Sequence, residues 1–386
     1  MVGIDWRELY TQNQAAIATA GIRPPASTLA NLPAALMSVP RTTSPPHRPT
    51  LPRGGGALGE LHRRQPATGS AVRRRSHADD RVVVHVPPGL DPSVPVAAVC
   101  MLHGCTQDPT TFAAATAMNN IADRHGFVVF YPGQPRARNA QGCWNWFLPA
   151  HQQRGAGEPE LIAGIARRLI AKEFGQTVDP ARTFVAGLSS GGAMALILAA
   201  CYPDLFAAVA IHSGLPYRSA DDMTSAFTVM DRARATRAPD GHAIRAAMGE
   251  QARPVPSLVI HGTADRTVAP ENARRILAQL MHANHLAAPE ACGHDPAKPS
   301  VSQHARAAGG LPYTHDRWVG THGVLMHESI EVQNLGHAWS GGVPRSSYTD
   351  PRGPSASEAI WAFFSQTAHA STPTAAHQAD PTRTPA

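Results

Sequence analysis

The chain has 386 residues, of which 43% are hydrophobic and 16% are charged, a composition typical of a folded globular protein and too apolar for a disordered chain. No apolar run approaches the roughly 20 residues that a membrane-spanning helix needs, and no repeat favours a coiled coil or a collagen-like chain. The formal net charge is +6, but arginines crowded into the N-terminal region account for it, so we interpret them as a solvated linker and expect no nucleic-acid partner. These arginines are Arg53, Arg63, Arg64, Arg73, Arg74 and Arg75.

The two ends of the chain differ in composition from its middle. Residues 4–20 have the apolar spacing of one short helix, and residues 24–80 are so rich in Pro, Gly, Ser, Thr and Arg that burial cannot offset the entropy of ordering them. We therefore predict a helix and a flexible segment over 1–80, one large α/β domain over 81–367 and a disordered tail over 368–386. The N-terminus lacks the basic and apolar regions of a signal peptide, which predicts a cytoplasmic protein.

Strand and helix patterns alternate between these ends. The stretch 96–102 is continuously apolar, as a buried parallel strand should be, and residues 216–250 lack strand patterns, which predicts a helical excursion over the functional site. This alternation predicts a mostly parallel sheet with helices on both faces. The expected strands are 81–86, 96–102, 126–131, 182–186, 207–211, 257–260 and 329–333, and the expected helices are 108–122, 160–174, 190–201 and 355–364.

The segment 187–191, Gly-Leu-Ser-Ser-Gly, is a G-x-S-x-G motif between a predicted strand and a predicted helix. In that context a sharp turn lifts the serine hydroxyl above the sheet, the two glycines prevent clashes across the turn, and the helix N-terminus faces developing negative charge. The alternative is a chance Gly/Ser-rich turn. We predict Ser189 as a nucleophile rather than Ser190, whose own frame would need a glycine where Leu188 stands.

A serine hydroxyl needs a base and an orienting carboxylate, which in this class of site follow the serine in the order acid, then histidine. Asp265 lies just past the strand 257–260, although it would also serve as an ordinary turn cap. His337 lies in a loop of small residues directly after the strand 329–333. We therefore predict Ser189, Asp265 and His337 as a catalytic triad. We interpret the competing histidines as surface, hairpin or tail residues; they are His315, His322, His327, His369 and His377.

Acyl transfer also needs amide donors for the oxyanion of the tetrahedral intermediate. We expect one from Ser190, the residue after the nucleophile, and one from Cys105, in the turn after the strand 96–102, where Gly104 lets the backbone approach. This chemistry needs no metal and no organic cofactor. The five cysteines form no CxxC pair, so the sequence gives no sign of a zinc site.

Seven motifs in sequence order resemble the polyhydroxybutyrate (PHB) depolymerase family of esterases, which is related to feruloyl and acetylxylan esterases. They are LHGCTQ at 102–107, GCWNWF at 142–147, RGAGEP at 154–159, VAGLSSGG at 185–192, HGTAD at 261–265, GHAWSGG at 336–342 and YTDPRGP at 348–354. The resemblance spans about residues 81–367 and implies an α/β-hydrolase fold with the triad named above. It also implies a serine esterase that cleaves poly- or oligo(3-hydroxybutyrate)-type esters through an acyl-enzyme.

Two other functions stay open beside this one. A feruloyl or acetylxylan esterase would use the same triad on plant-type esters, and a non-catalytic relative would be a binding protein. The expected partner is a small ester or a polyester, with no nucleic acid and no membrane. Because many members of the resembled family are secreted, an extracellular location also stays open.

Some residues near the predicted site allow two interpretations. Cys105 and Cys143 lie in motifs that we expect to border the site. A disulfide between them would pin the turn 102–107, the predicted oxyanion turn, whereas reducing conditions in a cytosol oppose that bond. Trp144, Trp146 and Trp339 are candidates for an aromatic wall against the substrate, although core packing is the commoner role of such rings.

Overall fold

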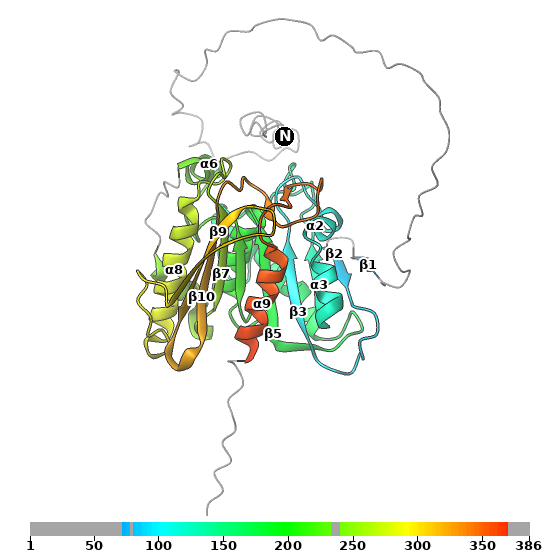
Figure 1. The fold of residues 1–386 in the computed structure, drawn as a ribbon. Coiled ribbons are helices and arrows are strands. Elements are labelled where there is room, and N and C mark those ends of the chain that lie inside the picture. The colour runs from blue at the N-terminus through cyan, green and yellow to red at the C-terminus, as the bar shows by residue number, and fades with distance from the viewer. Residues whose placement is uncertain (1–71, 78–79, 233–239, 370–386) are drawn as a thin grey trace, which may run out of the picture. The chain divides into compact units, whose positions relative to one another are not determined.

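The computed structural model describes residues 72–77, 80–232 and 240–369, and Figure 1 shows their arrangement. One sheet contains ten strands in the order β1-β2-β4-β3-β5-β6-β7-β10-β9-β8. The strands are β1 Val72–His77, β2 Asp80–His85, β3 Val96–Leu102, β4 Val128–Pro132, β5 Val178–Leu188, β6 Val209–His212, β7 Ser257–Gly262, β8 Val301–Arg306, β9 Pro312–Val319 and β10 Leu325–Val332. A separate short pair joins β11 Trp339–Ser340 to β12 Thr349–Asp350.

The middle of the sheet is parallel and its edges are antiparallel. Strands β4, β3, β5, β6, β7 and β10 run in the same direction, whereas β1 and β2 at one edge and β9 and β8 at the other pair antiparallel. All seven residues of β3 are buried, as expected for a strand covered on both faces. The predicted mostly parallel sheet is therefore confirmed.

Helices cover both faces of the sheet, and Figure 1 shows α3 and α9 lying across the face toward the viewer. Successive residues of a strand point to opposite faces, so Cys100 packs with the core of α4, α5, α7 and α8, and Met101 packs with the core of α2, α3 and α9. The helices are α2 Pro109–Thr116, α3 Met118–His125, α4 Gly157–Ile170, α5 Ser190–Cys201, α6 Met223–Arg232, α7 Gly241–Met248, α8 Glu271–Ala287 and α9 Ala356–His369.

The structure corrects several predicted elements. The single helix expected over 108–122 is two helices, because Ala117 between them adopts a left-handed conformation with φ of 52°. The hydroxyl of Thr116 donates to the carbonyl of Phe112 (3.0 Å) and accepts from the amide of Met118 (3.4 Å), so it competes with the helical hydrogen bonds at this break.

The strand β1 lies inside the segment 24–80 that we predicted to be flexible. It pairs along its whole length with β2. The sequence does not predict this strand, because β1 lacks the alternating apolar residues by which strands are recognised. The sequence also missed α8 and the hairpin of β8 with β9. The helices α6 and α7 confirm that the excursion over 216–250 is helical, although residues 233–239 lie outside the described part of the chain.

The predicted helix over 4–20, the rest of the N-terminal segment up to residue 71 and the tail from residue 370 lie outside the described residues. Among the residues that are described, no helix is both long enough and apolar enough to cross a membrane.

Candidate active site

Ser189 occupies the turn between the end of β5 and the start of α5. Its backbone has φ of 59° and ψ of −120°, a conformation that residues with a side chain rarely adopt and that is typical of strained functional positions. The neighbouring glycines make the turn possible: a Cβ atom on Gly187 would lie 2.3 Å from the carbonyl oxygen of Gly191, and one on Gly191 would lie 2.2 Å from that of Leu102. The motif found in the sequence is therefore explained by close backbone contacts.

Asp265 and His337 are joined by a hydrogen bond. The Nδ1 atom of His337 lies 2.8 Å from Oδ2 of Asp265, while Oδ1 of the same carboxylate accepts the amides of Thr267 (2.9 Å) and Val268 (2.8 Å). With Nδ1 donating to the carboxylate, Nε2 of His337 is free to accept a proton. The structure therefore brings two of the predicted triad residues together in the geometry of a base and its orienting acid.

The Asp265 carboxylate is fully enclosed, and Nε2 of a second imidazole, His261, lies 3.3 Å from its Oδ2. Burial opposes ionisation of this carboxyl, but the hydrogen bonds from His261 and His337 outweigh burial and hold the pKa of Asp265 well below its usual range. The acid is thus ionised at neutral pH. Despite these imidazoles, no group of three or more His, Cys, Asp or Glu in the described part of the chain is arranged to hold a metal ion.

The loops that carry the acid and the base lie side by side. The amide of Ala264 donates to the carbonyl of Leu335 (3.0 Å), and a Cβ atom on Gly262 would lie 2.2 Å from that same oxygen. Both loops follow strands whose carboxyl ends meet at one edge of the sheet, since β7 and β10 are parallel neighbours. The Ser189 turn follows β5, two strands away at the same edge.

The turn after β3 lies against the serine. A Cβ atom on Gly104 would lie 3.5 Å from the Cβ of Ser189, which is an ordinary van der Waals distance, so the backbone of this turn lies directly beside the serine. Among the hydrogen bonds of the described residues, none uses the amide of Cys105 or the amide of Ser190, the first residue of α5. Two amide donors are therefore free on the two segments that flank Ser189.

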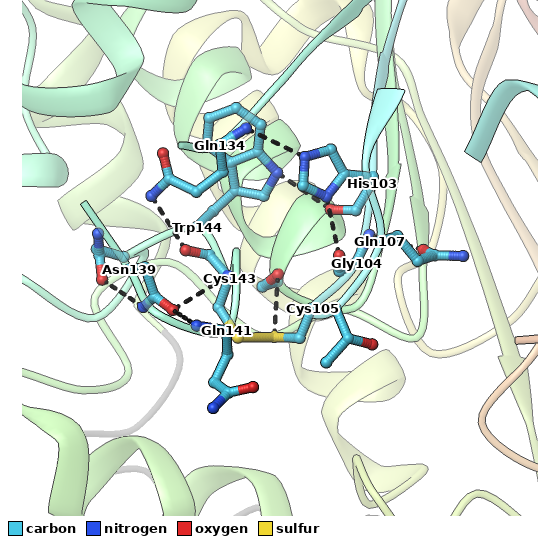
Figure 2. The surroundings of a disulfide bond; sticks show 12 residues. His103, Gly104, Cys105, Gln107, Gln134, Asn139, Gln141, Cys143 and Trp144 are labelled. Atoms are coloured by element: carbon cyan, nitrogen blue, oxygen red, sulfur yellow. Dashed lines mark hydrogen bonds between the residues drawn. A yellow bond between two sulfur atoms is a disulfide. The ribbon is translucent and has the colours of Figure 1, made fainter. Parts of the chain in front are cut away.

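A disulfide joins Cys105 to Cys143, with the two sulfur atoms 2.14 Å apart (Figure 2). The hydroxyl of Ser190 lies 3.5 Å from Sγ of Cys105, and since a disulfide sulfur carries no hydrogen, the hydroxyl is the donor. The indole of Trp144 donates to the carbonyl of His103 (3.1 Å), as Figure 2 also shows. The oxyanion turn is thus attached to the segment around residue 143 by a covalent bond and a hydrogen bond.

Buried polar groups hold that segment in place. The side-chain oxygen of Asn139 accepts the amides of Gln141 (3.0 Å) and Cys143 (3.2 Å). The carboxylate of Glu158, which is only 1% exposed, accepts both the amide (2.7 Å) and the side-chain nitrogen (2.6 Å) of Asn145. These contacts fix the loop from which Cys143 reaches the oxyanion turn.

The family model for esterase PHB depolymerase matches residues 81–297, which is more than half of the chain. The chain belongs to this family of PHB depolymerase esterases. Ser189, Asp265 and Cys105 fall within the matched residues, and His337 lies beyond them.

Curated relatives are named as polyester depolymerases, feruloyl esterases and acetylxylan esterases. Poly(3-hydroxyalkanoate) depolymerase C of Paucimonas lemoignei is 34% identical over 262 residues, which are 66% of this chain and 57% of the relative. Feruloyl esterase B of Neurospora crassa is 32% identical over 207 residues, which are 52% of this chain and 68% of the relative. The chain thus spans 57% and 68% of these two relatives' lengths.

The acetyl xylan esterase from Aspergillus awamori has the same fold. It superposes with a TM-score of 0.59 at 21% identity and covers 76% of this chain and 99% of its own. Together with the parallel sheet and the serine turn after β5, this similarity confirms the predicted α/β-hydrolase fold.

In this PHB depolymerase family member the three tryptophans pack in the interior. Trp339 is only 1% exposed, because its ring stacks on His212 (5.2 Å between centroids) and meets the edge of Phe112 (5.5 Å). Trp144 and Trp146 are 3% and 5% exposed. All three rings are thus packing groups of the interior, and the aromatic wall against the substrate stays a prediction.

Tyr348 is a half-buried residue near the site that sequence reasoning did not select. Its ring centroid lies 6.3 Å from that of His337, and its hydroxyl lies 3.4 Å from Oγ1 of Thr106 on the oxyanion turn. It opens the motif 348–354, one of the seven that carry the family resemblance. Tyr348 therefore lies beside both His337 and the turn after β3.

Proposed function

We propose that the chain is a serine carboxylic-ester hydrolase in which Ser189 is the nucleophile, His337 the base and Asp265 the orienting acid. The observation that carries this proposal is the 2.8 Å hydrogen bond between His337 and the buried Asp265, at the sheet edge where Ser189 occupies its strained turn. Family membership and the names of the relatives support ester hydrolysis.

The reaction follows from these positions. Ser189 Oγ attacks the ester carbonyl while Nε2 of His337 takes its proton, and Asp265 stabilises the imidazolium that forms. The free amides of Cys105 and Ser190 donate to the oxyanion, each contributing on the order of 10²- to 10³-fold to the rate. His337 then protonates the departing alcohol, and it later deprotonates the water that hydrolyses the acyl-enzyme.

We propose oligo- or poly(3-hydroxybutyrate)-type esters as the substrate. The relative named as a poly(3-hydroxyalkanoate) depolymerase is similar over 66% of this chain, against 52% for the relative named as a feruloyl esterase. The second candidate is a feruloyl or acetylxylan ester, which the relatives named as feruloyl esterase B and probable acetylxylan esterase A and the structural neighbour favour.

The test is hydrolysis of 3-hydroxybutyrate oligomers, amorphous PHB, methyl ferulate and acetylated xylan by the purified protein, side by side. Ser189→Ala should lose about 10⁶-fold in kcat, whereas the matched control Ser190→Ala, which keeps the backbone amide, should stay within about tenfold of the parent because it removes no oxyanion donor. Asp265→Asn should lose about 10⁴-fold, because the amide favours the wrong tautomer of His337.

Each outcome has a distinct meaning. Preference for the hydroxybutyrate esters supports the proposed substrate, and preference for ferulate or acetylated xylan keeps the mechanism and replaces the substrate. A protein that hydrolyses none of them and resists a fluorophosphonate label would be the non-catalytic binding protein instead. Full activity in Ser189→Ala would overturn the triad.

We also propose that the protein works in an oxidising compartment. Structural disulfides persist mainly in oxidising surroundings, and the Cys105–Cys143 bond supports such a location. Protein alkylated directly from cells should carry these two cysteines as a disulfide; two alkylated thiols would favour the cytoplasm.

A further inference from the structure

His212, the last residue of β6, belongs to neither the triad nor the oxyanion turn, yet its main chain contacts the nucleophile. Its carbonyl oxygen accepts the amide of Ser189 at 2.9 Å. This bond holds the start of the serine turn to the neighbouring strand. The residue is 1% exposed, so its side chain lies inside the protein and not in the solvent-facing part of the site.

The imidazole of the same residue contacts the loop of the catalytic base. Its Nε2 atom accepts the amide of Ser340 at 3.1 Å, three residues after His337 in the chain. Its ring also stacks on Trp339, with 5.2 Å between centroids and 23° between the planes. The loop that carries His337 therefore rests on this imidazole.

The ring must be neutral to accept at Nε2, and its surroundings keep it so. Burial, with the nearby His261 and His337, lowers the pKa of His212 to about 3, although Asp265 acts in the opposite direction. Nδ1 lies 3.1 Å from the hydroxyl of Ser213, which completes the pairing of both ring nitrogens.

We propose that His212 is a positioning residue of the esterase site. Its main chain binds the serine turn and its ring binds the loop of His337, so that it joins the two segments. The proposal rests on the proposed function. Without an acceptor at this position the Ser340 amide is left unpaired in the interior, and the loop moves to find another partner. Because His337 acts in the transition state, a displacement of about 1 Å lowers kcat by up to about 100-fold and changes KM little.

The experiment compares two substitutions of this residue. His212→Gln keeps an acceptor near the position of Nε2, and His212→Leu has a similar volume without any acceptor. We expect His212→Leu to lose 10- to 100-fold in kcat with KM within about twofold, and His212→Gln to recover most of the loss. If His212→Leu does not fold, His212→Asn, whose shorter side chain does not reach the Ser340 amide, takes its place.

His327 provides a matched control. Although we interpreted it from the sequence as a surface or hairpin residue, it is another fully buried imidazole, and burial lowers its pKa to about 3. Its Nδ1 lies 2.8 Å from the hydroxyl of Ser257, where β7 begins, at the edge of the sheet opposite the site. His327→Leu should destabilise the protein as much as His212→Leu does, but it should leave kcat unchanged.

Two results would overturn the positioning role alone: a kcat of His212→Leu equal to that of the parent, or an equal loss in His212→Leu and His212→Gln. In both cases the parent remains active and Ser189→Ala inactive, so the proposed function survives. An inactive parent would instead overturn the proposed function and the positioning role with it.

Discussion

Breaking the disulfide should destabilise the protein far more than it slows the reaction. Cys105 and Cys143 are 38 residues apart. A bond that closes a loop of this length lowers the chain entropy of the unfolded state, which raises the free energy of unfolding by about 4 kcal/mol at 25 °C. For a domain of this size, losing this stabilisation when the disulfide is broken corresponds to a fall in Tm on the order of 10 °C.

The folded turn, in contrast, keeps other attachments. The amide of Thr106 donates to the carbonyl of Gln141 (2.7 Å), and the indole of Trp144 donates to that of His103 (3.1 Å). Loss of an oxyanion donor costs on the order of 100-fold or more in kcat. Since these hydrogen bonds still hold the turn, we expect kcat of the folded variant to fall less than about tenfold.

Urea unfolding of the parent and of the double variant Cys105→Ser/Cys143→Ser, each with and without dithiothreitol, measures the effect. The reductant should destabilise the parent to the level of the double variant and should leave the double variant unchanged. Cys292→Ser, which alters a buried free cysteine and opens no loop, should respond to the reductant like the parent. A parent whose free energy of unfolding is insensitive to complete reduction would refute the loop-entropy reasoning.

Two further predictions concern pH and substrate contact. The free energy of unfolding should fall as the pH is lowered below about 6.5. His212 and His327 each have a pKa near 3 in the folded protein, so between pH 6.5 and 3 they bind protons only in the unfolded state. At pH 5 each histidine therefore lowers the free energy of unfolding by about 2 kcal/mol. Urea unfolding at pH 5 and pH 8 should show about half of this loss in His327→Gln, and an undiminished loss would contradict the assignment. Tyr348→Ala should raise KM for an oligoester about fivefold, whereas Tyr348→Phe, which keeps the ring, should have a KM near that of the parent. If steady-state kinetics give Tyr348→Ala the same KM as the parent, Tyr348 does not contact the substrate.

Local patterns were enough to predict much of the core. The helix 190–201 was predicted with the bounds that α5 has, because the glycine-rich turn and the apolar run that define it are adjacent in the chain. The strand 96–102 was predicted with the bounds of β3 for the same reason. The order of Ser189, Asp265 and His337 along the chain predicted the triad, and the contact between Asp265 and His337 is present in the structure.

Features that depend on backbone pairing were missed. The strand β1 and the hairpin of β8 with β9 lie at the sheet edges, where no buried face imposes alternating apolar residues: every residue of β8 is exposed. The helix expected over 108–122 broke at Ala117, since the hydroxyl of Thr116 offers an alternative partner to the helical backbone.

The sequence by itself determined the fold class and predicted the residues that we propose as the triad, because both depend on short patterns of burial, turn geometry and residue type. Only the tertiary structure decided which side chains surround them. Thr106 and Tyr348 lie 242 positions apart and still meet, Trp339 is enclosed rather than exposed, and the ring of His212 supports a loop 128 residues away. Such contacts form when the carboxyl ends of parallel strands gather at one edge of the sheet, and no local pattern records which loops meet there.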